Sequence, residues 1–210
     1  MRRGNSGIIG EVATPNKNQA SGVFSTFEQR LLRKQAKWPT QINFQVEYLV
    51  IAGGGGGGSD RAGGGGAGGY RTNYTSSTPL TPKLSGANSS IETTFFATTG
   101  TSYNVTVGAG GVGGVNSPVR GSNGSNSIFN TIISIGGGGG GGGDSLSAGL
   151  STAAAGGSGG GGSTGGTSPG QQPGGAGTAN QGFAGGTGGL HVPDYNGAGG
   201  GGAEIGRAHV

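Results

Sequence analysis

Apolar and polar residues alternate most clearly between residues 42 and 50. Ile42, Phe44, Val46, Tyr48 and Val50 occupy every second position, and polar residues stand between most of them. A period of two places such residues on one face of an extended strand. The stretch runs directly into a block of glycines. We therefore predict one strand here that leads into the glycine-rich part of the chain.

Shorter segments rich in branched and aromatic residues recur further along the chain. They are Ile91–Ala97, Tyr103–Val107 and Ser127–Ile135, and the last again leads directly into glycines. Such side chains fit the half-buried surface of a pleated sheet. We predict a strand in each segment.

A short helix is predicted before the first strand. Ser25 and Glu28 have the spacing of a capping box, and the residues that follow are good helix formers. The helix should span about 26–37, because Pro39 disfavours helical geometry in the residue before it. Four large apolar residues fall near one face: Phe24, Phe27, Leu31 and Trp38. Packing on the chain's own domain is favoured over a three-fold seam between copies.

Glycine content changes this picture. Nearly all of the 57 glycines lie between Gly53 and Gly202, in runs such as Gly53–Gly58 and Gly136–Gly143. Glycine loses much backbone freedom on folding and has no side chain to bury. The runs therefore either stay disordered or form extended polyproline II helices that bond to one another through the backbone.

Order is favoured, because charged residues make up only 10% of the chain and β-type segments interrupt the glycine blocks. The predicted fold class is mainly β with packed polyglycine II helices. A short N-terminal α-helix in segment 1–41 precedes a layered, sandwich-like domain over 42–203.

The last seven residues, 204–210, break this composition. Their back-translation resembles a widely used sequencing adapter, so we treat them as an artefact and exclude His209 as a ligand. The natural chain is then expected to be longer.

Charge and composition bear on the function class. The net charge is +4, but more than half of the 12 basic residues precede residue 40, which leaves the glycine-rich part nearly neutral. An RNA-binding glycine-rich segment would carry arginine or aromatic residues throughout. These observations argue against RNA binding. A flexible matrix or RNA-associated protein is kept as the alternative hypothesis. The sequence has no cysteine and shows neither a signal peptide nor a transmembrane run.

The carboxylates are too scattered to indicate hydrolytic chemistry, and no Gly-Lys pair could serve a phosphate-binding loop. We expect no enzyme activity, cofactor or metal. A polysaccharide depolymerase would require two acids such as Asp144 and Asp194 to meet in space.

Binding residues are expected in the stretches between glycine blocks, because loops on a rigid scaffold carry recognition. Tyrosine and arginine offer large contact areas at modest entropic cost. The candidate receptor-binding residues are Tyr70, Arg71, Tyr74, His191 and Tyr195. For Tyr70 and Tyr74, filling a small core beside the strands is an equally good interpretation.

Three segments carry a family resemblance. They are residues 46–52 (VEYLVIA), 103–111 (YNVTVGAGG) and 121–129 (GSNGSNSIF), each leading into or containing glycines. In this order they resemble the glycine-rich domain of bacteriophage tail proteins, and the resemblance covers roughly 42–202. Residues 20–39 also resemble a short element of structural proteins in phages of aquatic bacteria.

The resemblance implies a virion component, a tail fibre or a tail-tip adhesin, made in the host cytoplasm and carried on the phage tail. It would present variable loops to a bacterial surface receptor, either a protein or a polysaccharide, and would contact other tail proteins. A homotrimer is left open. Binding to nucleic acid and insertion into a membrane are not expected.

Overall fold

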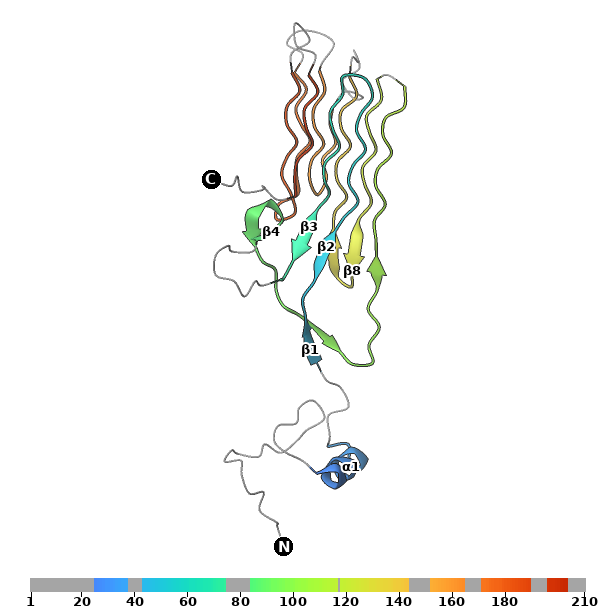
Figure 1. The fold of residues 1–210 in the computed structure, drawn as a ribbon, viewed down its shortest axis with the longest axis vertical. Coiled ribbons are helices and arrows are strands. Elements are labelled where there is room, and N and C mark those ends of the chain that lie inside the picture. Colours follow the sequence, from blue (N-terminus) through green and yellow to red (C-terminus); the bar gives the residue numbers. More distant parts are fainter. Residues whose placement is uncertain are drawn as a thin grey trace. The chain divides into compact units, whose positions relative to one another are not determined.

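The computed structural model describes residues 25–37, 43–74, 84–116, 118–143, 152–164, 171–189 and 196–203 (Figure 1). The chain forms two compact units. The N-terminal unit comprises Met1–Val46 and Phe95–Ser102, and the glycine-rich unit comprises Glu47–Thr94 and Tyr103–Val210. The elements in chain order are α1 (Thr26–Lys34), β1 (Asn43–Val46), β2 (Leu49–Ile51), β3 (Tyr70–Thr72), β4 (Leu84–Ser85), the 3-10 turn η1 (Gly86–Asn88), β5 (Ser89–Ser90), β6 (Phe95–Thr98), β7 (Val105–Thr106), β8 (Ser127–Phe129) and β9 (Ile132–Ser134).

The predicted helix and its capping box are confirmed. The Ser25 side chain accepts a hydrogen bond from the Glu28 N–H, and the Glu28 carboxylate accepts one from the Ser25 N–H. The hydrogen bonds from Ser25 lower the pKa of Glu28. The helix ends at Lys34, earlier than predicted, and Ala36 follows in a left-handed conformation with φ of 53°. The proposed stop at Pro39 lies outside the described residues.

None of the α1 residues is buried, and Phe27 is 74% exposed. Phe24 and Trp38 of the predicted apolar face lie outside the described residues. The partner of this face therefore stays a prediction.

The prediction of one strand over 42–50 is wrong. The chain forms β1 and β2 with a break at Tyr48, whose N–H donates to Asn73 Oδ1 at 2.7 Å. The Tyr48 carbonyl accepts from Thr72 Oγ1, also at 2.7 Å. Side chains thus replace a sheet partner at this residue. The two strands belong to different sheets, because β1 pairs antiparallel with β6 and β2 pairs antiparallel with β3.

The other predicted strands are shorter or divided. β6 begins at Phe95 rather than at residue 91, and β7 is limited to Val105–Thr106. Segment 127–135 is a hairpin, not one strand, because the chain reverses through Asn130 at a φ of 53°. β8 pairs antiparallel with both β7 and β9. The coarse prediction of a mainly β protein with one short helix is confirmed.

Most of the glycine-rich unit consists of extended segments that lie side by side (Figure 1). Backbone hydrogen bonds connect them in two rows, which we call the glycine lattice. The first row consists, in bonding order, of 109–115, 52–59, 63–69, 197–202 and 183–188. The second row consists of 119–125, 136–143, 154–162 and 172–178. Further bonds join the rows, so the interior segments bond to neighbours on several sides.

The hydrogen bonds of the lattice repeat every three residues. In segment 52–59, one set of N–H groups donates to 63–69 and the next set donates to 119–125. The pairs of the first set are Ala52 to Gly69, Gly55 to Gly66 and Gly58 to Gly63. The pairs of the second set are Gly53 to Ser125, Gly56 to Ser122 and Ser59 to Val119. Successive residues therefore face different neighbours, as three residues per turn require.

Interior segments need glycine for space. Every residue of segment 136–143 is buried. A Cβ atom on Gly136, Gly137 or Gly138 would overlap a carbonyl oxygen of a different neighbour: Gly124, Gly66 and Ala154, respectively. Among the described glycines, only Gly68 and Gly100 have positive φ. The requirement in 136–143 is thus for a missing side chain rather than for an unusual backbone conformation.

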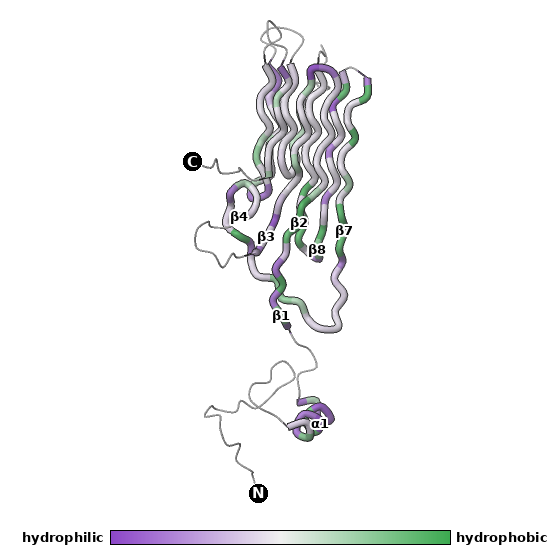
Figure 2. The backbone as a smooth tube through the Cα atoms, viewed as in Figure 1, coloured by the Kyte–Doolittle hydropathy of each residue, from purple (hydrophilic) through white to green (hydrophobic). Residues whose placement is uncertain are grey.

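The edge segment 109–115 tolerates side chains on its outer face. Ala109, Val112 and Val115 are exposed at three-residue intervals, and both valines are 69% exposed. Figure 2 shows this strip as green positions on the tube that continues from β7. Glycines at 108, 111 and 114 face inward, where a Cβ would overlap the backbone of 119–125.

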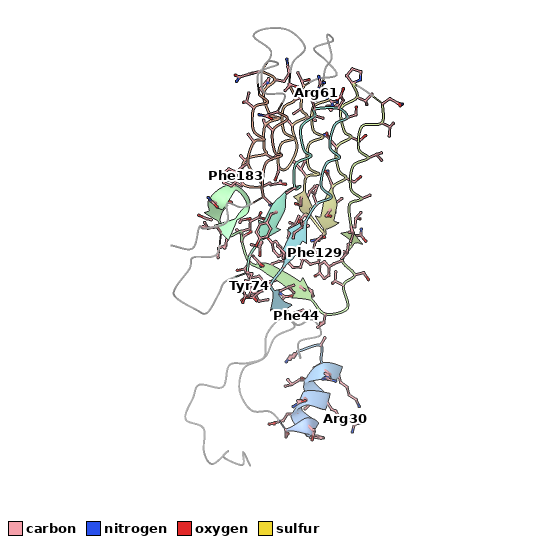
Figure 3. All side chains as sticks on the ribbon, turned by 45° about the horizontal axis from the view of Figure 1, so that its top comes forward. Arg30, Phe44, Arg61, Tyr74, Phe129 and Phe183 are labelled. Atoms are coloured by element: carbon pink, nitrogen blue, oxygen red, sulfur yellow. The ribbon has the colours of Figure 1, made fainter. Side chains whose placement is uncertain are left out.

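The side-chain core of the glycine-rich unit is small. Its buried apolar residues are Tyr48, Val50, Ala52, Ile132 and Ala154. The ring of Tyr48 lies against that of Phe129, with centroids 6.1 Å apart. Figure 3 places Phe129 at the end of the unit where the strands lie, and Arg61 at the opposite end. We call the end that contains Phe129 the strand end and the end that contains Arg61 the turn end.

Candidate functional site

An ion pair between Arg71 and Glu92 forms the polar centre of the strand end. β3 positions Arg71 opposite Val50 of β2. Its Nε donates to Glu92 Oε1 at 2.5 Å and its Nη2 donates to Oε2 at 2.6 Å. Nη1 donates to the Ile133 carbonyl at 3.1 Å. This two-pronged contact fixes both side chains, because the planar guanidinium matches the carboxylate.

Tyr48 extends this cluster. Its hydroxyl donates to Glu92 Oε2 at 3.2 Å. Burial, followed by the negative charge of Glu92, raises the pKa of Tyr48 to about 12. The hydrogen bonds to Glu92 likewise raise the pKa of Arg71. At neutral pH Tyr48 is therefore a neutral phenol and Arg71 a cation.

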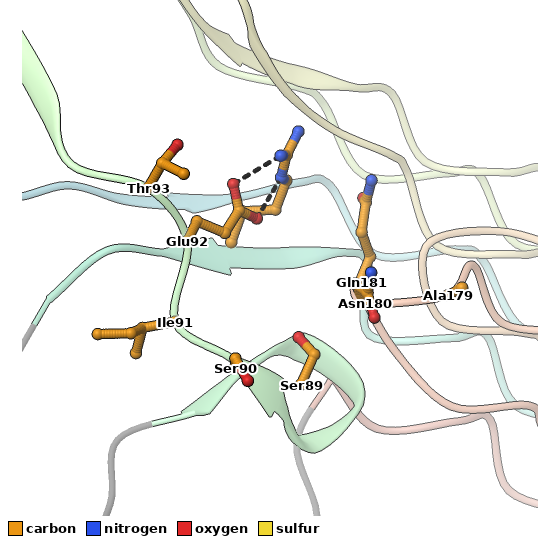
Figure 4. Close-up of a pocket in the computed structure, with 9 residues that line it drawn as sticks. Ser89, Ser90, Ile91, Glu92, Thr93, Ala179, Asn180 and Gln181 are labelled. Atoms are coloured by element: carbon orange, nitrogen blue, oxygen red, sulfur yellow. Dashed lines mark hydrogen bonds and ion pairs between the residues drawn. The ribbon is translucent and has the colours of Figure 1, made fainter.

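A cavity of about 550 Å³ lies beside the ion pair (Figure 4). Its wall combines β3, β5, the residues that follow β5 and a turn from far along the chain. The lining residues are Arg71, Ser89, Ser90, Ile91, Glu92, Thr93, Ala179, Asn180 and Gln181. Hydroxyl, amide and charged groups therefore surround the space, with Ile91 and Ala179 as apolar contacts.

Gln181 ties this turn to the sheet. Its Oε1 accepts from the Ile135 N–H at 2.8 Å, and its Nε2 donates to the Ile133 carbonyl at 3.4 Å. The side-chain amide thus pairs with β9 much as another strand would. The Gln181 carbonyl also accepts from the Tyr70 N–H at 3.0 Å. Gln181 therefore connects the turn in the cavity wall to β9 through its side chain and to β3 through its backbone.

One of the three predicted binding residues that the structure describes lines the cavity. Arg71 lines the cavity, whereas Tyr70 and Tyr74 are not among its lining residues. Tyr70 is half-buried in β3, and Tyr74 is 46% exposed. His191 and Tyr195 lie outside the described residues, so their proposed role stays a prediction.

Sequence reasoning missed Glu92, Gln181 and the serines of β5 as site residues. Glu92 was one of several scattered acids, and 20 positions separate it from Arg71. The Glu92 N–H donates to the Thr72 carbonyl at 2.9 Å, so the residues after β5 lie alongside β3. The sequence signal for this pair was limited to one arginine and one acid on two separate β-type segments.

The turn end gathers several chain reversals. Ser59 donates its N–H to the Val119 carbonyl and accepts from the Gly143 N–H. Thr164 Oγ1 donates to the Arg61 carbonyl at 3.3 Å. The described segments that end at residues 143 and 164 therefore end close to the place where 60–62 reverses the chain. Residues 189 and 196 bond to each other across a further connection.

Among the described residues, no group of three or more His, Asp or Glu side chains is placed to hold a metal ion. No helix in the same part of the chain has the length and apolar character needed to span a bilayer.

Comparison with protein families gives one match. Residues 34–209 match the family described as glycine-rich domain. The match covers most of the chain, so the protein belongs to this glycine-rich domain family. No curated protein and no solved structure matches the chain.

Proposed function

We propose that this protein is a structural and recognition component of a bacteriophage tail, either a tail fibre or a tail-tip adhesin. It acts by binding a bacterial surface receptor, a protein or a polysaccharide, without covalent catalysis. Its place is the virion, in contact with other tail proteins. The resemblance of segments 46–52, 103–111 and 121–129 to phage tail glycine-rich domains motivates this proposal.

The observation that carries the proposal is the gathering of chain reversals at the turn end of the lattice. Ser59 forms backbone hydrogen bonds there with both Val119 and Gly143. A lattice held together by backbone contacts does not depend on side chains from its connecting loops for a core, so the loop sequences can change to suit a receptor. Recognition loops on a rigid scaffold also lose little freedom on binding.

We further infer that the lattice segments are polyglycine II helices. The three-residue hydrogen-bond period supports this assignment. So does the lack of positive φ at lattice glycines other than Gly68, because the left-handed polyproline II helix has negative φ. Such helices would make the scaffold stiff although its side-chain core is small.

Stiffness can be tested by native-state hydrogen exchange of the full chain. The amides of Gly137, Gly138 and Gly140 should exchange slowly, since each donates a hydrogen bond inside the lattice. Exchange at the rate of an unstructured chain would refute the scaffold and would favour the flexible-matrix alternative.

The virion assignment needs a separate experiment. An antibody raised against the recombinant chain should label the tails of virions purified from the source of the gene, in immunogold electron microscopy. The genes beside the locus should also encode virion components. Absence of the protein from virions, together with RNA binding that weakens steeply with salt, would replace the proposal by the RNA-associated alternative.

A further inference from the structure

The cavity beside the Arg71–Glu92 pair is assembled before any ligand arrives. Tyr70 and Gln181 join the two sides through the backbone, and the Gln181 side chain bonds to β9. Glu92 is fixed by two contacts from Arg71 and one from the Tyr48 hydroxyl. A pocket whose polar walls are already in place requires little ordering on binding.

The charges of the cavity cancel. Arg71 and Glu92 are 27% and 17% exposed at the side chain and are paired with each other. An anion would compete with Glu92 for the guanidinium, and a cation would compete with Arg71 for the carboxylate. A neutral ligand avoids this competition. The cavity therefore does not favour phosphates, carboxylates or amines.

The remaining polar groups both donate and accept hydrogen bonds. Ser89, Ser90 and Thr93 contribute hydroxyls, and Asn180 contributes an amide. The Ser89 hydroxyl is buried and has no hydrogen-bond partner among the described residues. A ligand hydroxyl could supply that partner once the Ser89 side chain rotates toward the cavity. Figure 4 shows these side chains around one space.

Two apolar side chains complete the wall, Ile91 and Ala179. A ligand that matches this mixture carries several hydroxyl groups on a ring whose carbon-bound hydrogens can contact them. The volume of about 550 Å³ lies within the usual range of small-molecule sites.

We propose that this cavity binds a neutral monosaccharide unit. The site lies at the strand end and includes Arg71, one of the predicted binding residues, whereas the chain reversals that carry the proposed function lie at the turn end. The sugar-binding proposal rests on the described residues of the cavity and does not require the protein to be part of a virion. The two proposals can therefore fail independently.

The experiment is a titration of the isotope-labelled full chain with D-glucose, D-galactose and N-acetyl-D-glucosamine, followed by two-dimensional NMR. At least one sugar should shift the amide signals of Ser90, Thr93 and Asn180 in a saturable way at millimolar concentrations. Glucose 6-phosphate serves as the charged comparison and should bind more weakly than glucose.

Two variants locate the binding site. Ser90→Trp places a large side chain at an exposed position in the cavity wall and should weaken binding by at least about tenfold. Ser122→Trp, at an exposed lattice serine that does not line the cavity, should bind like the parent chain. The spectrum of each variant without sugar shows whether it is folded.

Arg71→Lys tests the polar wall separately, because it keeps the charge but loses the two-pronged contact. It should weaken sugar binding severalfold. The proposal is overturned if no neutral sugar produces saturable shifts, if Ser90→Trp binds as well as Ser122→Trp, or if only the phosphorylated sugar binds.

Discussion

Segments 136–143 and 109–115 both belong to the glycine lattice, yet they use glycine differently. The first is glycine at every position and buried throughout, whereas the second carries Ala109, Val112 and Val115 on an exposed face. The interior segment has a neighbouring segment on each of its three faces, so a Cβ added on any face would meet backbone atoms. The edge segment bonds to 52–59 and to 119–125, and its third face is exposed. The comparison shows that glycine content measures how many faces of a segment are covered.

The largest expected effect comes from adding one methyl group to the interior. In Gly139→Ala, the new Cβ would overlap the carbonyl oxygen of Gly121, and backbone atoms cannot move aside as a flexible side chain can. We expect a loss of more than about 4 kcal/mol in the free energy of unfolding. Chemical denaturation followed by circular dichroism measures it. A variant with the parent's stability would show that the interior is not closely packed.

A smaller effect is expected from pH, because Tyr48 titrates at the strand end and the glycine lattice depends on backbone contacts that do not titrate. The folded pKa of Tyr48 is raised from 10.0 to about 12, so the folded state retains the phenolic proton longer than the unfolded state. This contribution to stability is fully present below pH 10 and is lost as the pH rises toward 12.

Unfolding of the parent chain and of Tyr48→Phe across this pH window measures the effect. The parent should lose more stability than the variant, because the variant has no proton to release at this position. Equal losses in the two proteins would contradict the assigned environment of Tyr48.

The smallest effect is expected on the outer face of the edge. Val112→Thr changes a side chain that is 69% exposed while keeping its branched shape. The melting temperature should shift only slightly, in line with a free-energy change within about 0.5 kcal/mol. Differential scanning calorimetry checks this. A large destabilisation would mean that the valine strip is covered by another part of the protein or by a second copy.

Local patterns in the sequence were informative where the structure depends on neighbouring residues. Ser25 and Glu28 form the expected capping box because both partners lie within one turn. The repeat of 108–115, with glycine at 108, 111 and 114, also contains the three-residue period of the lattice. A reader of the sequence could therefore have inferred which face of this segment points inward.

Features that depend on distant residues could not be predicted. The predicted strand breaks at Tyr48 because Thr72 of β3 and Asn73, which follows it, supply its hydrogen bonds. The pairing of Arg71 with Glu92 likewise depends on the path of the chain between them. No local spacing rule connects these residues, since their contact is a product of the fold.

The most direct test of the three-residue register compares two alanine substitutions within one segment. Gly111→Ala places a Cβ on the inner face, where it would overlap the Ser122 carbonyl oxygen. Gly113→Ala places it on an open face, 3.6 Å from the Gly57 carbonyl oxygen, which is ordinary contact. Neither glycine has positive φ, so a left-handed backbone penalises neither substitution.

The free energy of unfolding of the two variants should differ widely. We expect Gly111→Ala to lose several kcal/mol and Gly113→Ala to be unchanged or more stable by up to about 1 kcal/mol, because alanine restricts the unfolded chain. Equal stability of the two variants, or the reverse order, would contradict the lattice.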